Sequence, residues 1–138
     1  FGMPQAVTSF GYSKITNQPD HMITHYQYQD IPLVVAEGSW AMSDGFSFNM
    51  GFTVNFENAT VVYDLAAPQP LMLHQQGTAE SVPVENVMGY DREIAYFLDC
   101  IQAGKQPTVV TMEDAVRTVR IVEAEVHSVQ TGKTIPLE

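Results

Sequence analysis

The chain has 138 residues, of which 45% are hydrophobic, and its 16 acidic and 6 basic residues give a net charge of −10. Length and composition indicate one folded domain with its own core. The negative charge repels phosphate backbones and anionic lipids, which excludes nucleic acid and membranes as expected partners. No apolar run approaches the roughly 18 residues that a membrane helix needs.

Cys100 is the only cysteine, so an intrachain disulfide is excluded and a reducing compartment is favoured. We therefore expect a cytoplasmic protein, with periplasmic export of a longer parent as the alternative. The chain begins at Phe1 rather than at methionine, and we expect it to be part of such a longer protein.

Strands are predicted through the first half of the chain. Six segments are rich in β-branched or aromatic residues and are bounded by turn residues. They are 4–14, 21–29, 33–41, 49–57, 60–65 and 70–76. In 49–57 every second residue from Met50 to Phe56 is apolar, which is the period of a strand with unlike faces.

The last third of the chain changes to helical spacing. Apolar residues recur every three or four positions from Tyr90 to Ile101, and Gly104 is expected to end this helix with a positive φ. A second helix is expected to begin after the N-cap residue Thr111 and to end at Gly132. Its expected buried stripe comprises Met112, Ala115, Val116, Val119, Val122, Val126 and Val129. A short edge strand is expected within 133–137.

Strands followed by helices, without β-α-β alternation, predict an α+β fold. We expect a mainly antiparallel, open-faced sheet of about six strands, with the two C-terminal helices packed on one face. The second strand carries large side chains on both faces, with His21 and His25 on one and Tyr26 on the other. Because two helices cover only one face, the other is expected to pack against a neighbouring domain or a second subunit. A wet aromatic face is the alternative.

Few residues carry a recognisable chemistry. The sequence contains no glycine-rich phosphate loop, so no dinucleotide site is predicted. His21 and His25 share a strand face, but a spacing of about 13 Å is too long for one metal ion, and no metal site is predicted. Cys100 lacks a histidine at a spacing that would activate it and is interpreted as structural.

Four residues are candidates for contacts with a substrate. Lys14 is the only lysine or arginine before Gly89, and is either a solvated lysine or a contact for an anion or hydroxyl. Trp40 either packs against the protein or stacks on a sugar. His21 and His25 are either sheet-face or pocket histidines. No Ser-His-Asp or paired-carboxylate arrangement stands out, so no catalytic residue is assigned.

The segment GYDREIAYFLDCIQAGKQPTVVTMEDAVRTVRIVEAEVHSVQTGKTI closely resembles the end of the glucose-fructose oxidoreductase/inositol dehydrogenase/rhizopine-catabolism (Gfo/Idh/MocA) family. The matching residues are Tyr90, Glu93, Phe97, Ile101, Gly104, Pro107, Asp114, Ala115, Ser128, Thr131 and Gly132. The strand ending in EGSW at Trp40 and the hairpin into VVYDL add a weaker match. The resemblance covers nearly the whole chain.

This resemblance implies that residues 1–138 are the C-terminal substrate and dimerisation domain of an NAD(P)-dependent oxidoreductase acting on a sugar, polyol or related alcohol or ketone. The family's N-terminal Rossmann domain binds NAD or NADP, and its Glu-Lys-Pro lysine and Asp-x-x-x-His pair are expected upstream of Phe1. Lys14, His21 and His25 do not match those motifs. The chain alone is therefore expected to bind no NAD(H) and to be inactive.

The expected partners are the Rossmann domain, a second copy bound through the sheet face, and a sugar-like small molecule. The alternative function is a stand-alone carbohydrate-binding or dimerisation module with the same fold and no enzyme attached. A Rossmann fingerprint upstream favours the enzyme, whereas an initiator methionine or a signal peptide there favours the module.

Overall fold

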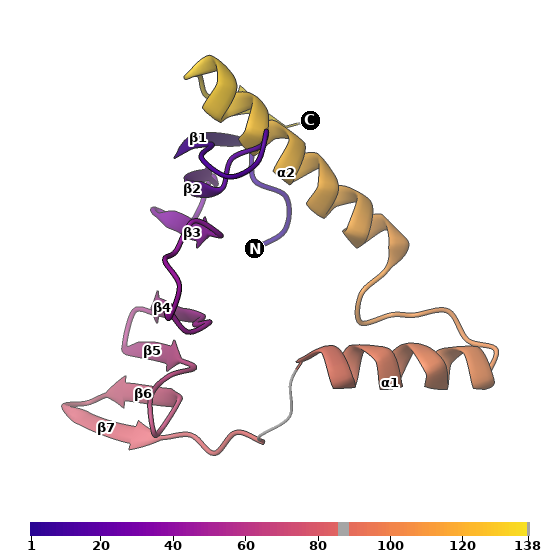
Figure 1. The fold of residues 1–138 in the computed structure, drawn as a ribbon. Coiled ribbons are helices and arrows are strands. Elements are labelled where there is room, and N and C mark those ends of the chain that lie inside the picture. Colours follow the sequence, from indigo (N-terminus) through magenta and orange to yellow (C-terminus); the bar gives the residue numbers. More distant parts are fainter. Residues whose placement is uncertain (86–88, 138) are drawn as a thin grey trace. The chain divides into compact units, whose positions relative to one another are not determined.

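The computed structural model describes residues 1–85 and 89–137, and the chain divides into two compact units (Figure 1). The first unit comprises Phe1–Asp44 and Gln106–Glu138, and the second comprises Gly45–Lys105. Seven of the eight described strands precede the two helices and no β-α-β alternation occurs among the described elements, which confirms the α+β class. The described residues form eight strands in two antiparallel four-stranded sheets, where about six strands in one sheet were predicted. The single-domain assignment stays a prediction.

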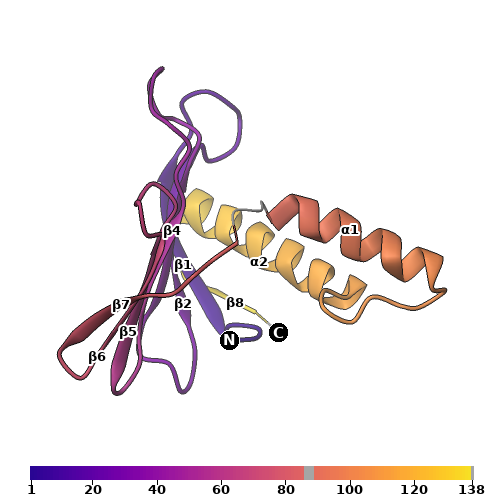
Figure 2. The ribbon, with the colours of Figure 1, turned by 90° about the horizontal axis from the view of Figure 1, so that it is seen from below.

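The first unit contains a sheet with the strand order β3-β2-β1-β8, which we call the first sheet. Its strands are β1 (Ala6–Tyr12), β2 (His21–Gln27), β3 (Val34–Ser39) and β8 (Ile135–Pro136). At one end of this sheet Tyr12 lies opposite His21, and His21 lies opposite Ser39. The predicted C-terminal edge strand is confirmed, since β8 pairs with Ala6 and Val7 of β1 (Figure 2).

Helix α2 (Met112–Thr131) packs against β1 and β8. The hydroxyl of Thr111 accepts the backbone N–H of Asp114, while the Asp114 carboxylate accepts the backbone N–H of Thr111, each at 3.1 Å. At the other end Gly132 has a φ of 66°, a value that glycine adopts without strain, and its N–H donates to the Ser128 carbonyl at 2.8 Å. Both predicted helix ends are confirmed. They could be predicted because helix caps depend on residues close together in sequence.

The buried face of α2 differs from the predicted stripe. The buried residues are Ala124, Glu125 and Ser128, whereas Met112 and Val119 are exposed. Part of this buried face is polar because the Ser128 hydroxyl accepts the Ser9 N–H and the Glu125 carboxylate accepts the Tyr26 hydroxyl, and buried polar groups need hydrogen-bond partners. The predicted stripe is therefore wrong from Met112 to Val122, and its last two members, Val126 and Val129, are half-buried.

Polar side chains are among the buried residues of α2 and the first sheet. The Ser9 N–H donates to the Ser128 hydroxyl at 2.9 Å, and the hydroxyls of Ser9 and Thr24 share a hydrogen bond of 2.8 Å. The Tyr26 hydroxyl donates to the carboxylate of Glu125. Burial and the neighbouring Glu125 raise the pKa of Tyr26 far above its ordinary value of 10. We call these five residues the polar layer.

The second unit contains the second sheet, with the strand order β4-β5-β6-β7. Its strands are β4 (Gly51–Asn55), β5 (Ala59–Asp64), β6 (Leu71–Gln75) and β7 (Thr78–Ser81). The turn between β6 and β7 has positive φ at both Gln76 and Gly77, as a tight two-residue hairpin requires. Strand β7 was not predicted, because its exposed and mostly polar sequence TAES carries no apolar alternation.

Helix α1 (Gly89–Gln102) follows in the second unit. Its predicted end at Gly104 is confirmed by a φ of 61° at that residue. The N–H of Lys105 donates to the carbonyl of Cys100 at 2.9 Å and so satisfies one of the last carbonyls of the helix.

Candidate functional site

Three of the four predicted substrate contacts meet where β2 begins. Asp20 precedes this strand and is only 2% exposed. Its N–H donates to the Tyr12 carbonyl at 2.9 Å, and its own carbonyl accepts the N–H of Trp40 at 2.7 Å. The ends of β1 and β3 are thereby tied to the start of β2. We refer to Tyr12, Lys14, Asp20, His21 and Trp40 as the Asp20 junction.

The carboxylate of Asp20 organises the loop that carries Lys14. One oxygen accepts the N–H groups of Lys14 and Ile15, both at 2.6 Å, and the other accepts the Thr16 hydroxyl at 2.7 Å. Hydrogen bonds from Ile15, Thr16 and Lys14 hold the pKa of Asp20 far below its ordinary value of 3.8. The loop therefore closes around an anion of the chain itself, while the Lys14 side chain stays exposed.

His21 lies between Tyr12 and Glu37. Its Nε2 donates to Glu37 Oε1 at 2.8 Å, and its Nδ1 is 3.3 Å from the Tyr12 hydroxyl. Because a carboxylate only accepts, the proton of a neutral imidazole is on Nε2, and Nδ1 is free to accept from Tyr12. This row of phenol, imidazole and carboxylate can position a hydroxyl group or move a proton between its members.

The remaining candidates have different surroundings. Trp40 is 84% exposed and presents a free aromatic ring. His25 lies opposite Thr8 and Val35 in the middle of the first sheet. It shares a face with His21 but lies about 13 Å farther along the strand. The structure thus brings together Lys14, His21 and Trp40, and separates His25 from them.

The sequence did not single out Asp20, Tyr12 or Glu37. Asp20 is placed by its sequence in the turn NQPD, and an aspartate at the end of a turn is the one signal of its role. Tyr12 and Glu37 reach His21 across neighbouring strands. Such contacts depend on strand register, which is set by the assembled sheet.

Two kinds of feature are missing from the part of the chain that the structure describes. No three or more His, Cys, Asp or Glu residues are grouped in a way that could hold a metal ion. No described helix combines the length and hydropathy needed to span a membrane.

Comparison with known proteins gives matches of structure. No family model and no curated protein matches the chain. The aldose-aldose oxidoreductase from Caulobacter crescentus, solved with glycerol, matches 98% of the chain with a TM-score of 0.75 and 14% identity. The WlbA dehydrogenase from Bordetella pertussis, solved with NADH and UDP-GlcNAcA, matches 99% with a TM-score of 0.74 and 14% identity.

The chain spans less than half of these neighbours, 42% of the first and 41% of the second. At such low identity the likeness establishes the fold alone. The chain therefore shares the α+β fold of one part of these oxidoreductases, as the resemblance noted in its sequence led us to expect.

Proposed function

We propose that this chain is the C-terminal substrate-binding and oligomerisation domain of an NAD(P)-dependent oxidoreductase acting on a sugar, polyol or related alcohol or ketone. The observation that carries the proposal is the match of nearly the whole chain to 41–42% of each oxidoreductase neighbour. One neighbour is named for aldoses, and the other was solved with NADH and a nucleotide sugar. Both descriptions support a carbohydrate-like substrate.

In this proposal the parent is a bacterial enzyme of carbohydrate metabolism whose two domains have different functions. A Rossmann domain upstream binds NAD or NADP and supplies the catalytic residues, while this chain shapes the substrate pocket and is inactive alone. The parent enzyme is proposed to be cytoplasmic, with export to the periplasm as the alternative. The coding sequence for about 150 residues upstream of Phe1 is the first test. A Rossmann fingerprint there supports the enzyme, and an unrelated domain contradicts it.

Within this chain the Asp20 junction is the proposed substrate contact. The exposed ring of Trp40 suits the apolar face of a sugar, and the side chains of Lys14 and His21 suit its hydroxyl oxygens. His25 stays a candidate on the same sheet face. Trp40 is the only tryptophan, so a sugar substrate is expected to change intrinsic fluorescence through this site alone.

Replacing Lys14 with alanine in the whole enzyme is expected to lower kcat/KM about tenfold, because one charged hydrogen bond to the substrate is lost. Steady-state kinetics measure the effect. Lys105→Ala is the matched control, since Lys105 follows α1 in the second unit, and its kcat/KM should equal that of the wild type. An unchanged kcat/KM for Lys14→Ala ends the proposed role of this lysine.

Self-association is proposed through the face of the first sheet that is opposite α2, which we call the open face. Phe10, Ile23 and Val35 are exposed on it, and Phe10 lies directly opposite Ile23. An apolar patch of this kind marks an interface. A second copy of the chain is the proposed occupant.

Light scattering of the chain is expected to give about twice the monomer mass, because an interface of standard size would hold two copies together as a stable dimer. Phe10→Asp is expected to give the monomer mass with an unchanged circular dichroism spectrum. Ile15→Asp is the control, because Ile15 is also 66% exposed but lies in the loop after β1. A Phe10→Asp dimer, or an Ile15→Asp monomer, would contradict the assignment of this face.

A stand-alone carbohydrate-binding or dimerisation module is the second candidate function. It is favoured by the fact that the open face and the Asp20 junction are both built from residues of the first unit and require no cofactor. An initiator methionine or a signal peptide directly upstream of Phe1 would support the module over the enzyme.

A further inference from the structure

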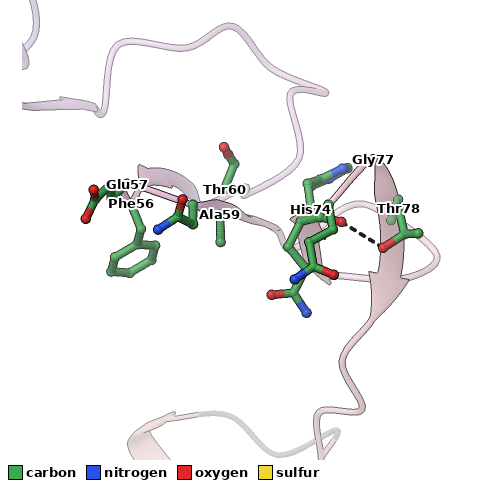
Figure 3. A pocket seen from close by; sticks show the side chains of 11 residues that line it. Phe56, Glu57, Ala59, Thr60, His74, Gly77 and Thr78 are labelled. Carbon is green, nitrogen blue, oxygen red and sulfur yellow. Dashed lines mark hydrogen bonds between the residues drawn. The ribbon is translucent and has the colours of Figure 1, made fainter.

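The second unit contains a cleft that the proposed function does not use. It has a volume of about 490 Å³ and lies at the end of the second sheet that carries the β4–β5 and β6–β7 turns (Figure 3). The side chains that matter for its chemistry are those of Phe56, Glu57, Ala59, Gln75 and Thr78. We call it the hairpin cleft.

Backbone pairing places four of these residues in one row across the sheet. The Phe56 N–H donates to the Ala59 carbonyl at 2.7 Å, which closes the β4–β5 turn. Ala59 lies opposite Gln75, and Gln75 lies opposite Thr78. Residues that lie directly opposite each other in an antiparallel sheet share a face. The side chains of all four residues therefore lie on the same face.

This row creates the hollow because its members differ in size. Ala59 is a small floor between the ring of Phe56 and the amide of Gln75. The ring is 61% exposed, so its face is available to a ligand. The Thr78 hydroxyl donates to the Gln75 carbonyl at 2.8 Å across the β6–β7 turn, as the dashed line in Figure 3 marks. Both turns are thus held by internal hydrogen bonds before any ligand arrives.

The lining selects the charge of the ligand. Among the described residues that line the cleft, Glu57 is the one carboxylate, His74 is the one imidazole, and none is lysine or arginine. A phosphate or carboxylate group would therefore meet no lysine or arginine and one carboxylate of like charge. An aromatic ring beside an amide and a carboxylate suits a neutral ring compound, with apolar C–H groups on one side and hydroxyls at the edge.

We propose that the hairpin cleft is a binding site for a neutral pyranose sugar, separate from the Asp20 junction. The C–H face of the sugar stacks on Phe56 over the Ala59 floor. Its hydroxyl groups hydrogen-bond to the Gln75 amide and the Glu57 carboxylate. The site is shallow and open to solvent, so the expected affinity is weak, with a Kd on the order of 1–10 mM.

The test is a titration of the ¹⁵N-labelled full chain with D-glucose, followed by the amide resonances of Gly77 and Ala79. Saturable shifts with a Kd on the order of 1–10 mM are expected. D-glucose 6-phosphate is expected to bind at least about tenfold more weakly, because the cleft repels its charge. Equal binding of the two sugars, or no saturable shift with D-glucose, would overturn the proposal.

Two variants separate the cleft from general effects on folding. Phe56→Ala removes the stacking ring, and Ala59→Val fills the floor while it keeps the ring; each is expected to raise the Kd at least about tenfold. Phe48→Ala is the control, because Phe48 is also exposed in the second unit but does not line the cleft. If the amide resonances of Phe56→Ala are no longer dispersed, this variant is unfolded, and the Kd of Ala59→Val is then the test of the site. An Ala59→Val chain that binds like the wild type would overturn the proposal.

The outcome is independent of the proposed oxidoreductase function. Trp40 fluorescence reports on the Asp20 junction, and the Gly77 and Ala79 amides report on the hairpin cleft. A sugar that changes only one of these two signals binds at the site on which that signal reports.

Discussion

Replacing Asp20 with alanine is expected to lower the melting temperature of the chain by about 5–10 °C. The substitution removes the acceptor for the N–H groups of Lys14 and Ile15 and for the Thr16 hydroxyl, so the loop after β1 loses its internal anion. Differential scanning calorimetry measures the change. Asp30→Ala is the matched control, because Asp30 is an exposed carboxylate beyond the other end of β2, and its melting temperature should stay within about 2 °C of the wild type.

The contribution of Asp20 also depends on pH. Its folded pKa is depressed, so the stabilisation is fully present above the unfolded value of 3.8 and is lost as the pH falls through the folded value. The difference in melting temperature between the wild type and Asp20→Asn should therefore be constant from about pH 5 to 8 and shrink below about pH 4. A difference that stays constant down to about pH 2 would show that the charge of Asp20 is not what closes the loop.

Replacing Tyr26 with phenylalanine is expected to reduce the free energy of unfolding by about 2–3 kcal/mol. The Glu125 carboxylate is only 5% exposed and would lose the hydroxyl that donates to it. Urea denaturation measures the loss. Tyr90→Phe, on the exposed surface of α1, is the control and should stay within about 0.5 kcal/mol of the wild type.

A second substitution tests the physical reason for this loss. Glu125→Gln in the Tyr26→Phe background should restore part of the stability, because a neutral amide costs less to bury than an unpaired carboxylate. The pH dependence gives a further check. Since the folded pKa of Tyr26 is raised, its stabilisation is present below pH 10 and lost as the pH rises further. A Tyr26→Phe chain as stable as the wild type would contradict the importance of this pair.

Features set by neighbouring residues were predictable from the sequence. The helix ends at Thr111 and Gly132 depend on side chains and φ values within one turn, and both were identified correctly. Strand β4 was predictable because its residues alternate in polarity. Strand β7 was not, because a short polar strand at an edge has no such pattern.

Features that join distant segments were not predictable. The buried residues of α2 include Ser128, whose hydroxyl accepts the N–H of Ser9, a residue more than a hundred positions earlier in the chain. The contacts of Asp20 and His21 require the register of three strands. Lys14, His21 and Trp40 could be suggested one at a time by residue type, but their meeting at one end of the sheet follows only from the assembled fold.

The pairing of β1 with β8 also sets an order of events during translation. Residues 45–105 emerge from the ribosome as one continuous segment, so the sheet of the second unit can form early. Strand β1 emerges before them but finds its edge partner only at 135–136. The Ser9 N–H likewise has no Ser128 hydroxyl to donate to until Ser128, 119 residues later, has been synthesised. Until β8 is synthesised, the second sheet can therefore be complete while the first sheet still has β1 as an unpaired edge.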